Sequence, residues 1–142
     1  MPSPINPALR LVLALAGTGI VLLGIDNAAG GIATLGWQVS PDFFSVNDRD
    51  AFAVRDSHAR FLGGVWLAIG LVFIAAAMRP MPFARTAPVI CGAIFLGGLL
   101  RFTQVQDLSV LASGDILPSL ALELIVFPLI GWWTIRETSK DR

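Results

Sequence analysis

Four apolar stretches follow one another along the chain, and most of the charged residues lie between them. The run from Phe61 to Met78 holds no charged residue and comes directly after a cluster of ionisable residues between Arg55 and Arg60. Crossing the ~30 Å hydrocarbon core of a bilayer takes roughly 20 apolar residues in a helix. The pattern therefore predicts a membrane-spanning helix over residues 55–78 that brings ionisable groups to one membrane face.

Three further stretches predict membrane helices of the same kind, over residues 7–29, 86–103 and 116–135. Asn6 suits the N-cap of the first helix, and Pro7 suits its first position because the missing N–H would have no partner there. Pro128 lies inside the fourth helix, where it removes a backbone donor and predicts a kink. The polar tail from Arg136 to Arg142 is expected to fray.

The first apolar run has a second interpretation as a secretory signal peptide. Arg10 would be its basic flank, and a small-residue cleavage site would lie near Ala28. Asp26 stands close to that site, and the apolar run is long for a signal peptide. We therefore prefer a membrane helix.

The longest segment outside the predicted spans is 30–54, which combines aromatic residues with aspartates. Trp37, beside a membrane, is expected at the interface. Asp42, Asp48 and Asp50 raise the question of calcium, but the glycine and the twelfth-position glutamate of an EF-hand are missing. We expect these acids to favour the dipole at a helix N-terminus instead.

The composition of the 142-residue chain also indicates a membrane environment: 55% of its residues are hydrophobic, 14% are charged, and the mean hydropathy is +0.73. Soluble domains carry about 25% charged residues. We therefore predict a single membrane domain over residues 1–142, with an all-α fold, an integral membrane four-helix bundle. The net formal charge of zero gives no electrostatic basis for binding nucleic acid.

Few residue patterns in the chain support catalysis or metal chemistry. Cys91 is the single cysteine, so no intramolecular disulfide can form. His58 is the single histidine, and one histidine with one distant cysteine does not make a metal site. No G-x-S-x-G motif is present. We predict no catalytic residue, no metal site and no cofactor.

The distribution of basic residues predicts the orientation of the helices. The N-terminal segment, the 79–85 turn and the C-terminal tail hold Arg10, Arg79, Arg85, Arg136, Lys140 and Arg142. Basic residues accumulate on the cytoplasmic side of membrane proteins. The distribution fits four helices with both the N-terminus and the C-terminus in the cytoplasm, and with 30–54 and 103–115 outside.

The sequence FLGG occurs once in the second predicted helix and once in the third, which are expected to run in opposite directions. Arg60 precedes the first copy and Arg101 follows the second, so each arginine lies roughly 5 Å outward of its glycines, at the same expected depth. Small residues let helices approach closely. We therefore expect Gly64 and Gly97 to lie at helix contacts.

Arg60 and Arg101 are two cations at the poorly hydrated edge of the membrane core, where a charge needs a partner. Glu123 on the fourth helix is the expected partner of one of them. Asp26 and His58 are expected at the edge of this cluster. A charged side chain within a membrane span is costly and is by default a functional hypothesis. Three interpretations stay open: a pair that only fixes helix register, a binding pocket, and acid–base chemistry.

Three segments carry a resemblance to a known family: HARFLGGVWLAIGL at 58–71, FLGGLLR at 95–101 and ELIVFP at 123–128. In these segments and in its four-helix pattern, the chain resembles the small bacterial membrane proteins grouped as domain of unknown function 4345. The resemblance implies an integral protein of the bacterial inner membrane, and it supplies no substrate or activity. The arrangement is also similar, at the level of the fold alone, to that of the DoxX-like four-helix membrane proteins.

Three functions are compatible with these features. The first is a binding or accessory module with an outward-facing pocket, whose expected residues are Arg60, Arg101 and Glu123, with Asp26 and His58 at the edge. Its ligand would be a small anion or a lipid headgroup, because the guanidinium fork matches carboxylate and phosphate oxygens. The alternatives are a structural or assembly subunit of a larger membrane complex and an oligomeric proton-coupled transporter. The expected partners are membrane lipid and either a second copy of the chain or a larger complex.

Overall fold

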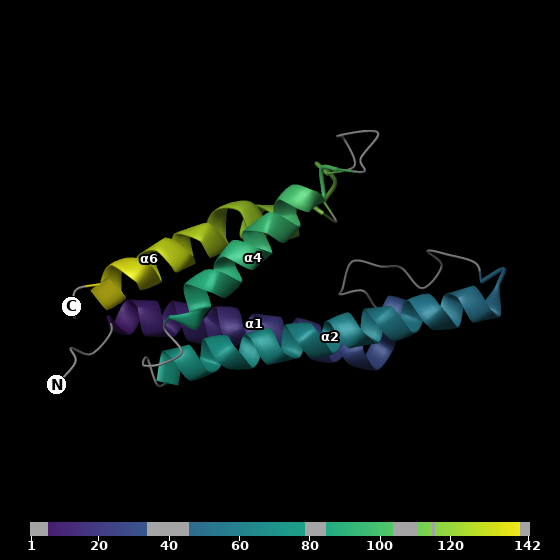
Figure 1. Cartoon of the computed structure of the whole chain (residues 1–142), viewed down its shortest axis with the longest axis horizontal. Coiled ribbons are helices and arrows are strands. Elements are labelled where there is room, and N and C mark those ends of the chain that lie inside the picture. The colour runs from purple at the N-terminus through teal and green to yellow at the C-terminus, as the bar shows by residue number, and fades with distance from the viewer. Residues whose placement is uncertain (1–5, 34–45, 79–84, 104–110, 115, 140–142) are drawn as a thin grey trace. The chain divides into compact units, whose positions relative to one another are not determined.

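A computed structural model describes residues 6–33, 46–78, 85–103, 111–114 and 116–139. Within these residues the regular structure is helical throughout, with no strand, which confirms the all-α prediction (Figure 1). The elements in chain order are α1 Pro7–Gly30, the 3-10 turn η1 Gly31–Ala33, α2 Arg49–Met78, α4 Thr86–Leu100, α5 Leu117–Ala121, η3 Leu122–Val126 and α6 Phe127–Ser139. The last three are successive parts of one continuous helical stretch.

In the described part of the chain, three helical stretches are long and apolar enough to cross a membrane: Pro7–Ala33, Arg49–Met78 and Leu117–Ser139. The chain therefore has the helices of an integral membrane protein. The fourth apolar helix, α4, has 15 residues and ends at Leu100 rather than at 103, because residues 101–103 form a turn. At 1.5 Å per residue α4 is only ~22 Å long, which is less than the ~30 Å hydrocarbon core.

Helix α2 begins at Arg49, earlier than the predicted start at residue 55. Asp48 explains the early start, because its carboxylate oxygen Oδ1 accepts hydrogen bonds from the backbone N–H groups of Asp50 and Ala51, both at 3.0 Å. An aspartate in this role satisfies donors that have no partner inside the helix. The expectation that these acids mark a helix N-terminus is therefore confirmed for Asp48, whereas Asp42 lies outside the described residues.

Helix α6 continues to Ser139, so the predicted end at residue 135 and the predicted fraying from Arg136 were wrong for this part of the tail. Hydroxyl groups bond back to carbonyls of the preceding turn: Thr138 Oγ1 donates to the Thr134 carbonyl at 2.9 Å, and Ser139 Oγ donates to the Ile135 carbonyl at 2.8 Å. Such local bonds let hydroxyl residues remain within a helix. Residues 140–142 lie outside the described part of the chain.

The contacts divide the chain into two compact units, which are described separately. The hairpin unit is Leu15–Ile74 and contains most of α1 and α2. The terminal unit combines Met1–Ala14 with Ala75–Arg142, and it holds the start of α1, the end of α2 and all later helices.

In the hairpin unit, α1 and α2 run antiparallel and touch along a seam of glycines (Figure 1). Gly17 faces Gly70, and Gly24 lies against the backbone at Gly63 and Leu67. A Cβ atom built on Gly24 would lie 2.4 Å from the Leu67 backbone nitrogen. The glycines on each helix are one heptad apart, a spacing that keeps them on one face of the helix. Without side chains between them, the two backbones approach closely.

The structure corrects the prediction for the two FLGG segments. At Gly64 and at Gly97, no atom of the described residues beyond the glycine's own neighbours lies within 4 Å of the position that a Cβ would take, so neither glycine makes a helix contact within this part of the chain. The adjacent glycines make the contacts instead: Gly63 lies against Ala28, and Gly98 lies against Glu123. Successive residues of a helix point about 100° apart, so a glycine pair by itself does not tell which member faces the neighbouring helix.

In the terminal unit, α4 packs along α6 (Figure 1). Cys91 and Ile94 of α4 are buried, as are Phe127 and Ile130 in the last helix. Gly131 allows the close approach, because a Cβ atom there would lie 3.0 Å from the Cys91 Cβ. This packing presents one end of α4 to the π-helical turn η3, where the charged pair described below is found.

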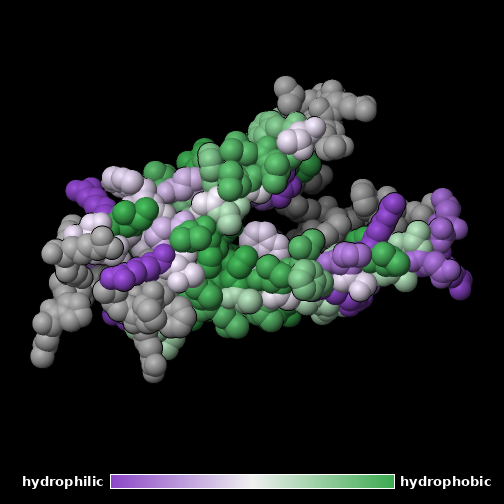
Figure 2. Space-filling model, in the orientation of Figure 1, coloured by the Kyte–Doolittle hydropathy of each residue, from purple (hydrophilic) through white to green (hydrophobic). Residues whose placement is uncertain are grey.

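Large apolar side chains remain exposed on many helical turns, as the face shown in Figure 2 illustrates, with hydrophilic residues gathered toward the helix ends. Leu15 and Phe61 in the hairpin unit and Leu96 and Ile125 in the terminal unit are examples. In water, such surfaces would be unfavourable, whereas in hydrocarbon they match their surroundings. The exposed apolar surface therefore agrees with a membrane location.

Candidate functional site

The first charged group, in the hairpin unit, closes the C-terminal end of α1. Arg60 donates through Nε to the Asp56 carboxylate at 2.7 Å. Its Nη1 group donates to the carbonyl of Ala28 at 3.2 Å and also to the carbonyl of Ala29. The last carbonyls of a helix have no partner within it, and a cation is favoured at that end of the helix dipole. Arg60 therefore acts as a cap on α1 provided by the neighbouring helix.

Gly31 completes this cap, because it allows the chain to turn at the end of α1. Its φ angle of +64° lies in the left-handed region that favours glycine, and a Cβ atom would lie 1.9 Å from Asp56 Oδ1. The turn directs the backbone N–H of Ile32 to the same carboxylate oxygen at 2.9 Å. Asp56 thus binds both Arg60 and the backbone beyond the helix, which ties α1 to α2.

The other two predicted site residues of the hairpin unit lie on different helices. His58 is exposed on α2, and its Nδ1 donates to the Val54 carbonyl at 2.8 Å, since a carbonyl can only accept. Asp26 is half-buried on α1. His58 therefore makes a local bond along its own helix.

The second charged group, in the terminal unit, joins the end of α4 to η3. Arg101 donates to both carboxylate oxygens of Glu123: Nε to Oε2 at 2.7 Å and Nη2 to Oε1 at 2.6 Å. This two-pronged geometry is the strong form of an ion pair. The expectation that Glu123 pairs with one of the two arginines is confirmed, and the structure shows that the partner is Arg101.

Glu123 lies on a π-helical turn. In η3 the Phe127 N–H bonds to the Leu122 carbonyl, five residues back, instead of four. Pro128 accounts for the change, because it has no N–H and its ring would clash with the Leu124 carbonyl in a regular α-helix. Single π-helical turns of this kind occur frequently at functional sites.

Gly98 makes the room that the pair needs. A Cβ atom on Gly98 would lie 2.9 Å from the Glu123 Cβ and 3.3 Å from its Oε2. Arg101 is one helical turn further along α4, at its C-cap, so its side chain reaches the same carboxylate. The FLGGLLR segment therefore supplies both the space for Glu123 and its partner.

The five predicted site residues are thus divided between the units: Arg60, Asp26 and His58 lie in the hairpin unit, and Arg101 and Glu123 lie in the terminal unit. A pocket shared by all five stays a prediction. Sequence reasoning did not assign Asp56 as the partner of Arg60, although the spacing of four residues on a helix was a usable signal. Within the described residues, no three of His, Cys, Asp and Glu come together as they would around a metal ion.

Comparison with known families matches residues 8–134 to the model of a domain of unknown function (DUF4345). The match covers most of the chain, and the chain belongs to this family. No curated protein and no solved structure matches it. The similarity to DoxX-like proteins stays a prediction.

Proposed function

We propose that the chain is a multi-pass protein of the bacterial inner membrane that binds a small anionic ligand at Arg101 and Glu123. The ligand carries a carboxylate or a phosphate, either free or as part of a lipid headgroup. One observation supports this proposal most directly: Arg101 already holds a carboxylate, that of Glu123, through two bonds of 2.7 and 2.6 Å. The guanidinium is therefore positioned as a receptor for this chemistry.

The exposure of the two side chains indicates how a ligand would arrive. The Arg101 side chain is 39% exposed, whereas that of Glu123 is 13% exposed. A ligand would approach the exposed side of the Arg101 guanidinium and compete with Glu123 for its N–H donors. The pair with Glu123 uses two of the five N–H donors of the Arg101 guanidinium. Glu123 itself lies on the π-helical turn, where the backbone differs from that of a regular α-helix.

Arg60 is a weaker candidate for the same role, because its Nε and Nη1 groups are already used by Asp56 and by the end of α1. The proposal therefore centres on Arg101.

The test compares anion binding by the detergent-purified parent and by matched variants, with inorganic phosphate, acetate and short-chain phosphatidylglycerol as probes. Glu123→Gln should bind about tenfold more tightly, because a charge-assisted hydrogen bond to Arg101 becomes available to the ligand. Arg101→Gln should bind none of the three probes at this site. Arg60→Gln is the matched control and should bind as the parent does if Arg60 serves only as a cap.

The probes distinguish the sources of the ligand. Binding of phosphate or acetate indicates a free anion, whereas binding of the phosphatidylglycerol alone indicates a headgroup. If Glu123→Gln and Arg101→Gln both bind every probe as the parent does, the pair is structural and the proposal fails.

A second candidate function, an assembly subunit of a larger membrane complex, is supported by an open side of α4. At Gly92 and Gly97, none of the residues that the structure describes comes within 4 Å of the position that a Cβ would take, and Val89 and Leu96 on the same helix are exposed. Small residues on a membrane helix suit contact with another helix. A stoichiometric protein partner in mild detergent would favour this function, and a homogeneous single species would disfavour it.

The proton-coupled alternative also uses Glu123. A proton on its carboxylate would remove the negative charge that holds Arg101, and a ligand anion could take its place. Such a transporter would need several copies of the chain. Proton uptake by vesicles containing the protein, dependent on an imposed anion gradient, would support this alternative.

The proposed topology leads to a separate prediction. Reporter domains fused after residue 142 or within 79–85 should be cytoplasmic, because basic residues accumulate at these positions, and reporters within 30–54 or 103–115 should be external. Since α4 is short, the 103–115 fusion is the informative one. A cytoplasmic reporter there would show that α4 does not cross the membrane, and a cytoplasmic reporter in 30–54 would reverse the orientation.

A further inference from the structure

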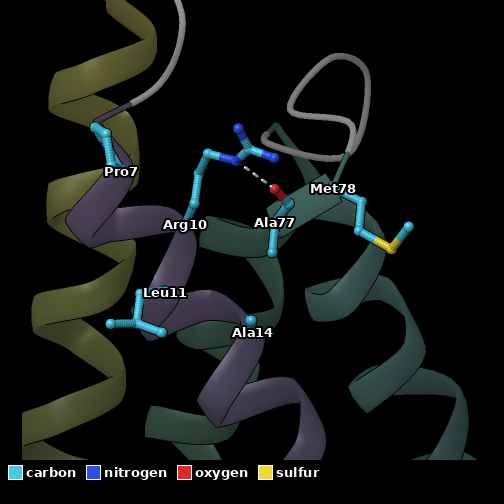
Figure 3. Close-up of a pocket in the computed structure, with 6 residues that line it drawn as sticks. All are labelled: Pro7, Arg10, Leu11, Ala14, Ala77 and Met78. Atoms are coloured by element: carbon cyan, nitrogen blue, oxygen red, sulfur yellow. Dashed lines mark hydrogen bonds between the residues drawn. The ribbon is translucent and has the colours of Figure 1, made fainter.

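A groove in the terminal unit lies where the start of α1 meets the end of α2 (Figure 3). Its volume is about 350 Å³, and its lining residues are Pro7, Arg10, Leu11, Ala14, Ala77 and Met78. The lining is apolar apart from one guanidinium, that of Arg10.

The guanidinium of Arg10 is held in place at this groove. Its Nε donates to the carbonyl of Ala77 at 2.8 Å, which caps the last turn of α2 (Figure 3). This bond uses one of the five N–H donors of the Arg10 side chain. The positive charge therefore has a defined position beside the apolar wall.

The apolar wall of the groove, formed by Leu11, Ala14 and Met78, includes large exposed side chains. Leu11 is 61% exposed and Met78 is 68% exposed, although both are large hydrophobic residues in helices with the composition of membrane spans. Leu11 follows Arg10 directly at the start of the apolar run of α1, so the groove joins a charged helix end to a hydrocarbon-facing surface. Such a combination matches a molecule with an anionic head and an apolar tail.

We propose that this groove binds one anionic phospholipid. Its phosphate is bound by the terminal N–H groups of the Arg10 guanidinium, and its acyl chain lies along Leu11, Ala14 and Met78. The guanidinium fork suits phosphate oxygens. The N-terminal end of the α1 dipole, on the same side, also favours a negative charge. This site is separate from the Arg101–Glu123 pair, since neither residue of the pair lines the groove.

Two other arginines allow a matched control. Arg85 at the start of α4 and Arg136 on α6 are exposed and belong to the same unit, but neither lines the groove. Both attract anionic lipid only as surface charges. A lipid preference that depends on Arg10 and not on Arg85 is therefore a property of the groove.

The experiment titrates the full chain in detergent with phosphatidylglycerol or phosphatidylcholine of identical acyl chains and counts bound lipid by native mass spectrometry. The parent should bind one phosphatidylglycerol about fivefold more tightly than phosphatidylcholine, the effect of one basic residue near an anionic headgroup. Arg10→Gln should bind the two lipids equally, and Arg85→Gln should keep the preference.

A second variant tests the apolar wall without removing the bond from Arg10 to Ala77. Ala14→Trp should fill the groove and lose the bound lipid of either kind, while its helical content stays that of the parent. The proposal is overturned if the parent binds the two lipids equally, if Arg85→Gln loses the preference as Arg10→Gln does, or if Ala14→Trp binds lipid like the parent.

Discussion

Glu123→Ala is expected to lower the free energy of unfolding by about 1.5–3 kcal/mol, because it removes the carboxylate that Arg101 binds, while the Arg101 side chain, 39% exposed, stays partly solvated. Both oxygens of Glu123 are bonded to Arg101, so the truncation removes two charge-assisted bonds at once. The measurement is reversible unfolding in detergent, with the helical signal followed during denaturant titration.

A double change identifies the partner. Glu123→Met combined with Arg101→Met replaces both members by apolar side chains and should recover much of the loss, because no charge is left unpaired. Glu123→Met combined with Arg60→Met should show no recovery, since Arg60 is bonded to Asp56 and to the end of α1. A Glu123→Ala variant as stable as the parent would show that the pair makes no energetic contribution and would remove the basis for the proposed site.

Gly63→Leu is expected to destabilise the hairpin unit by about 3 kcal/mol or more, because the contact has no space for a side chain. A Cβ atom on Gly63 would lie 2.3 Å from the Ala28 backbone nitrogen, and a backbone atom cannot move aside as a flexible side chain can. The two helices would have to separate and lose the contacts along the glycine seam. Thermal unfolding in detergent measures the loss.

Gly64→Leu is the matched control, one residue further along α2. Among the described residues, no atom lies within 4 Å of the position that its Cβ would take, so the first atom of a leucine side chain meets open space. Leucine also has the higher helix propensity, which predicts equal or slightly greater stability. Equal losses for the two variants would contradict the described contact between Gly63 and Ala28.

The helices themselves could be predicted from the sequence because their formation depends on local properties. Continuous apolar runs identified α1, α2 and the last helix, and Asn6 and Pro7 marked the start of α1 correctly. The errors lay at ends where polar residues form part of a helix. The first turns of α2 are rich in charged residues, so in the sequence they look like a loop unless Asp48 is recognised as the N-cap of a helix.

The charged site could be predicted only in part. The charges at Arg101 and Glu123 were evident, because a charge in an apolar helix needs a partner, and these two residues do pair. The capping role of Arg60 could not be found in this way, because in that role its acceptors are the backbone carbonyls of Ala28 and Ala29. Every residue has a backbone carbonyl, so the sequence does not indicate which carbonyls a distant arginine will bind.

The sequence by itself determined that this chain forms apolar helices for a membrane, which positions carry charge, and which family the chain belongs to. The tertiary structure alone decided that Gly63 and Gly98, rather than Gly64 and Gly97, face neighbouring helices, and that Glu123 binds Arg101. The physical reason is rotation about the helix axis. Composition and length specify a helix, but its rotation relative to its neighbours depends on how all side chains pack together, and a step of about 100° per residue changes every contact.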